Sequence, residues 1–312
     1  MPERVDVLPQ EKEAPKRKSS KGSDALLLPP KATSQPESLV IAGRIVTAVG
    51  LGLLLFVGYL FGFSKIAEAR SQAILTKQFQ GLVAQGVATA PGWIPQEGEP
   101  VAMFNIPAIG VSNLVALEGT TSGLLTEGPG HFRTTPLPGR PGNSVFAGRR
   151  STFGAPFGQL TELQAGDTIL VATPQGQFTY TVSQTKHVMP GQPDVLGPIL
   201  GRNTLTLVTS DPALSARGRL AVIATMSGPT LAPARIPPGG LSTSETGMAG
   251  DLSALGPLLL WGELLVCAIV LAWVLYRRWD HPRVVWLLST PVIVACAFLA
   301  FHSMVRLLPG TL

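Results

Sequence analysis

The chain has 312 residues, with 24 Lys and Arg against 19 Asp and Glu, and a net charge of +5 at pH 7. Its mean hydropathy of +0.30 is high for a protein that is soluble throughout and indicates membrane segments. The only cysteines, Cys267 and Cys296, lie inside long apolar runs, which excludes a disulfide framework, a CxxC zinc site and a cysteine nucleophile from the more polar remainder.

The chain opens on a polar segment, residues 1–40, which mixes Pro, Lys, Ser and Glu and is predicted to form a disordered cytoplasmic tail. Three later stretches are apolar over the length of about 20 residues that a bilayer requires. We predict transmembrane helices over 41–64, 254–276 and 284–306. A cleaved signal peptide is the alternative for the first, but a long polar segment precedes it and no A-x-A site follows promptly.

Basic residues in the short flanks predict the orientation. The tail contains the run KRKSSK, and the loop 277–283, RRWDHPR, joins the second and third spans. Both segments are therefore expected in the cytoplasm, although Lys65, Arg70 and Lys77 argue weakly the other way. The β-domain and the C-terminus would then lie outside the membrane, in a multi-pass protein with three spans.

Between the first and second spans we predict three parts. Residues 65–100 form an extracytoplasmic helix and linker, in which Leu75 and Phe79 belong to an apolar helical face that packs on the following domain. Residues 101–227 contain seven or eight short β-type runs, which suggest a barrel or sandwich, with a hairpin at TPQGQ and one helix over 155–167. Residues 228–253 read as a flexible linker.

Metal, cofactor and nucleic-acid binding find no support in this domain. The four histidines are scattered without HExxH spacing, so we expect no metal site and no cofactor. Its charges roughly balance and its basic residues are not interleaved with aromatics, so we expect no nucleic acid as a partner.

Four segments of the β-rich region carry a resemblance, and they occur as FNIPAIGV (104–111), LTEGPGHFRTTPLPGRPGNSVFAGRR (125–150), FGAPFGQLTELQAGDTILV (153–171) and TLTLVTSDP followed by RGRLAV. In this order they resemble the sortases, membrane-anchored cysteine transpeptidases of Gram-positive surfaces. The resemblance implies a mainly β fold, an eight-stranded barrel whose groove holds a sorting-signal peptide. In the family a Cys thiolate attacks a peptide carbonyl, a His acts as acid and base, an Arg steadies the oxyanion, and an amine resolves the thioester.

The resemblance also shows where the pattern changes. Arg149 stands where the family has its histidine, Ser210 where it has its cysteine, and Arg219 where it has its arginine. An alcohol needs an adjacent base more than a thiol does, and a guanidinium stays protonated and accepts no proton. The two changes together are therefore expected to disable catalysis, and we assign a catalytic role to none of these residues.

Other bases leave an enzyme possible. His131 lies in GPGHF and is expected to bond to the backbone, whereas His187 follows a strand and Asp211 directly follows Ser210. A hydrolase or transpeptidase that uses Ser210 with His187 or Asp211 stays open. The binding alternative is a groove made by Ser210 and the arginines, which would suit a carboxylate or an acidic peptide; these arginines are Arg149, Arg150, Arg217 and Arg219.

Two ionisable residues lie inside predicted spans, Glu263 in the second and His302 near the outer end of the third, and we predict that they pair. Three functions follow: a sortase-like pseudoenzyme that binds a surface protein, a sorting-signal-like peptide or an active sortase; a divergent enzyme using Ser210; or a subunit of a membrane complex with the barrel as its external cap.

Overall fold

The computed structural model describes residues 37–86, 93–189, 202–215, 217–233, 250–279 and 281–310. The predicted tail, up to residue 36, and most of the predicted linker, 234–249, lie outside the described residues. The chain divides into two units, Met1–Val49 and Gly50–Leu312. The described part of the first unit is the beginning of one helix.

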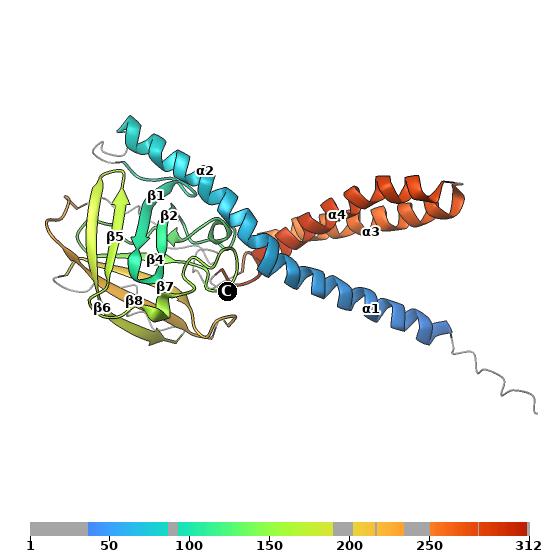
Figure 1. Ribbon diagram of the computed structural model, residues 1–312, viewed down its shortest axis with the longest axis horizontal. Helices are drawn as coiled ribbons and strands as arrows, with labels where there is room; N and C mark the ends of the chain where they lie inside the picture. Colours follow the sequence, from blue (N-terminus) through green and yellow to red (C-terminus); the bar gives the residue numbers. More distant parts are fainter. Residues whose placement is uncertain are drawn as a thin grey trace, which may run out of the picture. The chain divides into compact units, whose positions relative to one another are not determined.

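Eight strands close into a barrel in the order β1-β2-β3-β4-β7-β8-β6-β5 (Figure 1). Their bounds are β1 Pro100–Ile106, β2 Val111–Glu118, β3 Gly130–His131, β4 Asn143–Ala147, β5 Thr168–Thr173, β6 Gly176–Val188, β7 Thr204–Ser210 and β8 Arg219–Ser227. The pairs β2–β3 and β4–β7 are parallel and the others antiparallel. The predicted eight-stranded barrel and the β5–β6 hairpin are confirmed.

Alternation of side chains along β7 divides its neighbours between two apolar clusters. Leu205 and Leu207 point into the main core, where Phe104 and Phe146 meet edge to face with ring centroids 4.9 Å apart. Val208 belongs to a second cluster, with Leu125 and Phe132 among its members. Both faces of β7 are therefore covered, and all seven of its residues are buried.

The helix predicted over 155–167 is wrong, because only Leu160–Glu162 forms a short 3₁₀ turn. At the start of the predicted helix, Phe153, Gly154 and Ala155 all have positive φ, which a right-handed helix does not allow. Pro156 follows, and Leu160 is fully buried in the barrel core. This segment therefore packs against the barrel core without forming an α-helix.

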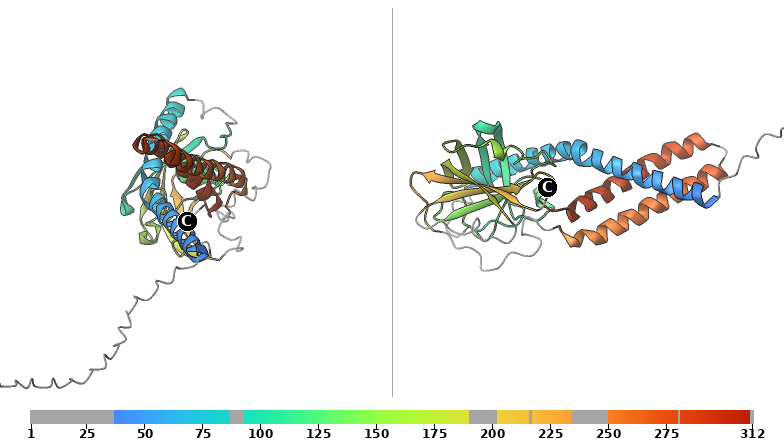
Figure 2. Two further views of the ribbon diagram at one scale, coloured as in Figure 1. Left: turned by 90° about the vertical axis from the view of Figure 1, so that its right-hand side faces the viewer. Right: turned by 90° about the horizontal axis from the view of Figure 1, so that it is seen from below.

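Three helical segments are long and apolar enough to cross a membrane: Ser38–Gln85, Leu252–Arg278 and Arg283–Leu307. The first joins α1 (Glu37–Gly58), a π-helical turn (Tyr59–Phe63) and α2 (Ser64–Gln85), and the others contain α3 (Leu255–Arg278) and α4 (Pro282–Leu307). Figure 2 shows α3 and α4 side by side as a hairpin.

The predicted packing of α2 on the barrel is present. Leu75 and Phe79 are buried against Val115 and Leu117 of β2. The Gln72 side chain accepts a hydrogen bond from the backbone N–H of Val115 (2.8 Å) and donates to its carbonyl (3.0 Å). The helix that enters from the membrane segment is therefore bonded directly to the barrel.

Candidate functional site

Ser210 ends β7, and its place in the sheet decides which residues surround it. It opposes Arg219, the first residue of β8. On the other side of β7, Ala147, the last residue of β4, pairs in parallel with Val208. The next residue, Gly148, donates its N–H to the Val208 carbonyl at 3.0 Å and accepts from Thr209 Oγ1 at 2.8 Å, and Arg149 follows it. The register thus places Ser210 opposite Arg219, whereas Arg149 follows the end of β4.

Arg149 differs from the expectation of a groove residue, because its side chain is fully buried. Its Nε donates to the Leu125 carbonyl at 3.0 Å, Nη2 to the Ser122 carbonyl at 3.0 Å, and Nη1 to Thr152 Oγ1 at 3.2 Å. Its guanidinium carbon lies 5.0 Å from the ring centroid of Phe153. The guanidinium is held by backbone carbonyls, as a structural cation is.

The charge of Arg149 follows from the same burial. Burial lowers the pKa of this guanidinium to about 9, which is still above neutrality. The group therefore stays protonated at pH 7 and accepts no proton from a neighbouring hydroxyl. Ser210 is itself fully buried at this edge of the barrel.

Asp211, the next residue, joins two basic side chains. Arg150 Nη1 donates to Asp211 Oδ1 at 2.8 Å and to the Ser210 carbonyl at 2.7 Å, and His187 Nδ1 lies 2.5 Å from Asp211 Oδ2. The hydrogen bond from Arg150, and then that from His187, lowers the pKa of the Asp211 carboxyl. Asp211 is thus an ionised carboxylate that orients His187.

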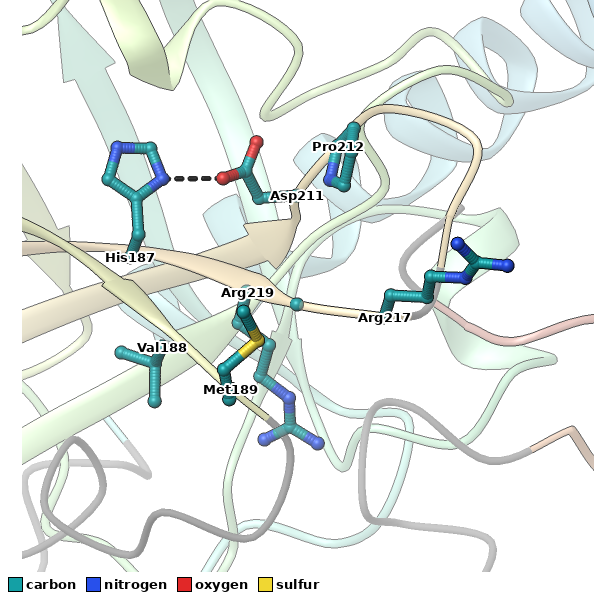
Figure 3. Close-up of a pocket in the computed structure, with 8 residues that line it drawn as sticks. His187, Val188, Met189, Asp211, Pro212, Arg217 and Arg219 are labelled. Carbon is teal, nitrogen blue, oxygen red and sulfur yellow. Dashed lines mark hydrogen bonds and ion pairs between the residues drawn. The ribbon is translucent and has the colours of Figure 1, made fainter.

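A cavity of about 310 Å³ opens beside these residues (Figure 3). His187, Asp211, Arg217 and Arg219 are among the residues that line it. Arg217 is exposed and Arg219 is half-buried, and burial lowers the pKa of Arg219. Two of the arginines predicted for the groove therefore border an open site, whereas Arg149, Arg150 and Ser210 do not line it.

His131 is buried on β3, where the sequence predicted a histidine bonded to the backbone. Its Nε2 lies 3.2 Å from the Pro136 carbonyl, but its Nδ1 also lies 2.8 Å from Glu118 Oε2. Sequence reasoning missed Glu118, whose only signal is an acidic residue at the end of an apolar strand. Both nitrogens of this buried histidine are therefore engaged by Glu118 and the Pro136 carbonyl.

Comparison with known proteins identifies the domain. A family model described as the sortase domain matches residues 104–227, which is most of the barrel. The barrel domain belongs to the sortase family. The match includes Arg149, Ser210 and Arg219, whereas the three long apolar helices lie outside it.

Two curated sortases are similar to this chain. Sortase SrtE1 of Streptomyces coelicolor is 26% identical over 206 residues, covering 60% of this chain and 58% of that protein. Sortase D of Bacillus subtilis is 30% identical over 118 residues, covering 38% of this chain and 58% of that protein. The chain thus spans 58% of the length of each. The solved structure of sortase E from Streptomyces avermitilis is 31% identical, covers 43% of this chain and 91% of that one, and has a TM-score of 0.38.

The membrane candidates lie outside residues 104–227, which the sortase model matches. Glu263 is exposed on α3 and His302 is exposed on α4. Within the ranges that the structure describes, neither a hydrogen bond nor an ion pair joins them. The ion pair at the end of the hairpin instead joins Arg306 Nη2 to Asp251 Oδ2, at 2.6 Å. Nor do three His, Cys, Asp or Glu side chains of the described residues gather as a metal site would require.

Proposed function

We propose that this protein is a membrane-anchored sortase-domain pseudoenzyme, which binds a surface protein, a peptide resembling a sorting signal, or an active sortase without transpeptidation. The observation that carries the proposal is the buried, hydrogen-bonded guanidinium of Arg149, which lies two residues after β4, the strand that pairs with the Ser210 strand β7. This cation occupies the place where acid–base chemistry needs a titratable group near neutral pH.

The nucleophile is also unsuited to the family's reaction. Ser210 carries an alcohol, which attacks a carbonyl only when a base takes its proton. The described cysteines, Cys267 and Cys296, lie in α3 and α4 rather than in the barrel. Loss of both a nucleophile and its base costs several orders of magnitude in rate.

What supports binding is the cavity beside the altered positions. It combines an exposed Arg217 with Arg219, and guanidinium groups suit carboxylates through paired hydrogen bonds. An acidic peptide or a chain-terminal carboxylate is therefore the ligand chemistry that we propose. The three helices would hold this site at the membrane, with the N-terminus in the cytoplasm and the barrel and C-terminus outside.

One observation favours a second candidate, a divergent hydrolase. The pair His187–Asp211 resembles the base and orienting carboxylate of a serine enzyme, and Asp211 directly follows Ser210. In that candidate, substrate binding would have to expose the Ser210 hydroxyl to His187.

A single assay separates the two candidates. The full-length protein in detergent is incubated with a library of quenched-fluorescent peptides and hydroxylamine as the amine acceptor, with Sortase SrtE1 assayed in parallel. We expect no turnover above background and no effect of Ser210→Ala. Turnover that Ser210→Ala abolishes would overturn the pseudoenzyme proposal.

Binding is measured separately by fluorescence anisotropy, with acidic peptides whose C-termini are free or amidated. We expect the affinity for free carboxylates to fall about tenfold or more in Arg217→Gln with Arg219→Gln, since hydrogen bonds to a charged group are each worth roughly 1.5–3 kcal/mol. Equal affinity for free and amidated peptides in the wild type would contradict the carboxylate assignment.

A further inference from the structure

The turn between α3 and α4 carries basic side chains at one end of the hairpin. Arg277 and Arg278 lie in the last turn of α3, and Arg283 lies in the first turn of α4. All three side chains are exposed, although the two helices pack along each other (Figure 2). The hairpin therefore presents three guanidinium groups to its surroundings within one short turn.

The length of α3 sets the depth of these arginines in a membrane. From Leu255 to Tyr276 the helix is about 32 Å long, at 1.5 Å per residue. A bilayer core is about 30 Å thick, so Arg277 and Arg278 lie just beyond the core when α3 spans the membrane, at the level of the lipid headgroups. Since α4 runs back from the same end, Arg283 lies at that level too.

Aromatic side chains accompany the arginines at this end of the hairpin. Trp273, Trp279 and Trp286 are three of the five tryptophans of the chain, and all three are exposed. Tryptophan is enriched where a membrane meets water, so these rings favour the same depth. The guanidinium carbon of Arg277 lies 4.4 Å from the ring centroid of Trp273, a cation–π contact that packs Arg277 against this aromatic layer.

The neighbouring sequence supplies little negative charge to neutralise the arginines. Asp280 is the one acidic residue in 264–312, so three positive charges less one negative charge leave +2 at the turn. The first span, residues 38–64, contains Arg44 as its one charged residue, so it brings no carboxylate to the turn whatever its position. Glu263 lies about 21 Å along α3 from Arg277, in the interior of the span. The turn thus has a net positive charge at the depth of the lipid phosphates.

We propose that this turn binds the headgroup of an anionic phospholipid. A guanidinium keeps its charge and forms paired hydrogen bonds with phosphate oxygens. A zwitterionic headgroup carries its own ammonium group, which competes with the arginines for the same phosphate, so a net positive turn favours a headgroup without one. The arginines therefore select the lipid around the hairpin, in addition to orienting the hairpin in the membrane.

The tryptophans of the turn report on the lipid beside it. In a variant with Trp93→Phe and Trp261→Phe, every remaining tryptophan lies at this end of the hairpin. This full-length protein is incorporated into vesicles of phosphatidylglycerol and phosphatidylcholine at several ratios, with brominated acyl chains on one lipid or on the other. Quenching of the tryptophan fluorescence in the two preparations gives the relative binding constant of the lipids. Both leaflets have the same composition, so the result does not depend on orientation.

We expect phosphatidylglycerol to be favoured at least about fivefold, which is roughly the 1 kcal/mol that one arginine contributes near a membrane surface. Arg277→Gln with Arg278→Gln leaves Arg283 opposite Asp280 and should lower the constant to about one. Lys186→Gln with Arg202→Gln removes two exposed charges from the barrel domain and is the matched control, which should keep the preference.

Equal quenching by the two lipids before any arginine is changed would overturn the proposal. A preference that survives Arg277→Gln with Arg278→Gln, or that falls as far in the control pair, would overturn it too. Flotation with the vesicles checks separately that the helices insert. A protein that does not float would contradict both this proposal and the proposed membrane anchoring, whereas a protein that floats without lipid preference would contradict this proposal alone.

Discussion

Arg149 and Ser122 contact each other twice in the interior of the sortase domain, where Nη2 of the arginine lies 3.0 Å from the Ser122 carbonyl oxygen and 3.3 Å from its Oγ. The same Ser122 hydroxyl donates to the carbonyl of Leu308, just after α4, at 2.9 Å. The arginine thus fixes a segment that is bonded in turn to the end of the last helix. Arg149 thus joins two parts of the chain through Ser122.

Arg149→Gln should destabilise the sortase domain, because an amide replaces at most part of a guanidinium that serves the Ser122 and Leu125 carbonyls together. Each unsatisfied buried group costs about 1–3 kcal/mol, so we expect a loss of about 2–4 kcal/mol and a lower Tm. Tryptophan fluorescence during denaturation of the full-length protein in detergent measures this loss.

Arg217→Gln is the matched control for that experiment. Its side chain is exposed, so the change should alter stability by less than about 0.5 kcal/mol. If Arg149→Gln is as stable as this control, the buried hydrogen bonds of Arg149 do not stabilise the segment that contains Ser122 and Leu125.

Ser210→Cys tests whether the altered site is open to solvent. The background is Cys267→Ser with Cys296→Ser, so that the introduced thiol is the only one. Because Ser210 is fully buried, alkylation by iodoacetamide should be at least about tenfold slower than for Arg217→Cys in the same background. Mass spectrometry of timed samples gives both rates, and equal rates would show an accessible site.

The sequence predicted the parts of this fold that depend on local pattern. The β-type runs predicted a barrel or a sandwich, the TPQGQ turn predicted the hairpin, and the three apolar stretches predicted the long helices, while the closed eight-stranded barrel came from the sortase resemblance. The helix over 155–167 failed because a run of positive φ at 153–155 and core packing at Leu160 override an apolar periodicity.

At the site, sequence identified Arg149 and Ser210 and the strands that carry them. Their burial could not be predicted, because two partners of Arg149 are the backbone carbonyls of Ser122 and Leu125, more than twenty positions away, and every residue type carries a carbonyl. The link between Asp211 and His187 joins the ends of β7 and β6, so it depends on barrel register. The predicted pairing of Glu263 with His302 rested on depth alone, and depth does not specify which side of a helix a residue faces.

Asp211→Asn should change the dependence of stability on pH. The pKa of the Asp211 carboxyl is lowered in the folded protein, so its contribution is complete above the ordinary value near 4 and disappears as pH falls through the folded value. Wild type and variant should therefore differ by up to about 1 kcal/mol at pH 6 and converge as the pH falls below the folded value. Denaturant titrations at several pH values measure the difference. If the difference in stability between wild type and variant instead grew as the pH fell, folding would disfavour the ionised carboxylate, contrary to its contacts with Arg150 and His187.

Introducing the residues that the sortase resemblance implies, by Arg149→His together with Ser210→Cys, should not produce transpeptidation. An imidazole is too short to donate to the Ser122 and Leu125 carbonyls together with Thr152, so the segment that contains Ser122 and Leu125 loses its anchor. We expect a Tm below that of Ser210→Cys alone and no thiol-dependent turnover of the peptide library with hydroxylamine. Ser210→Cys alone separates the effect of the thiol from that of the lost guanidinium. Turnover by the double variant at normal stability would show that Arg149 blocks an otherwise intact site, and that its hydrogen bonds are dispensable.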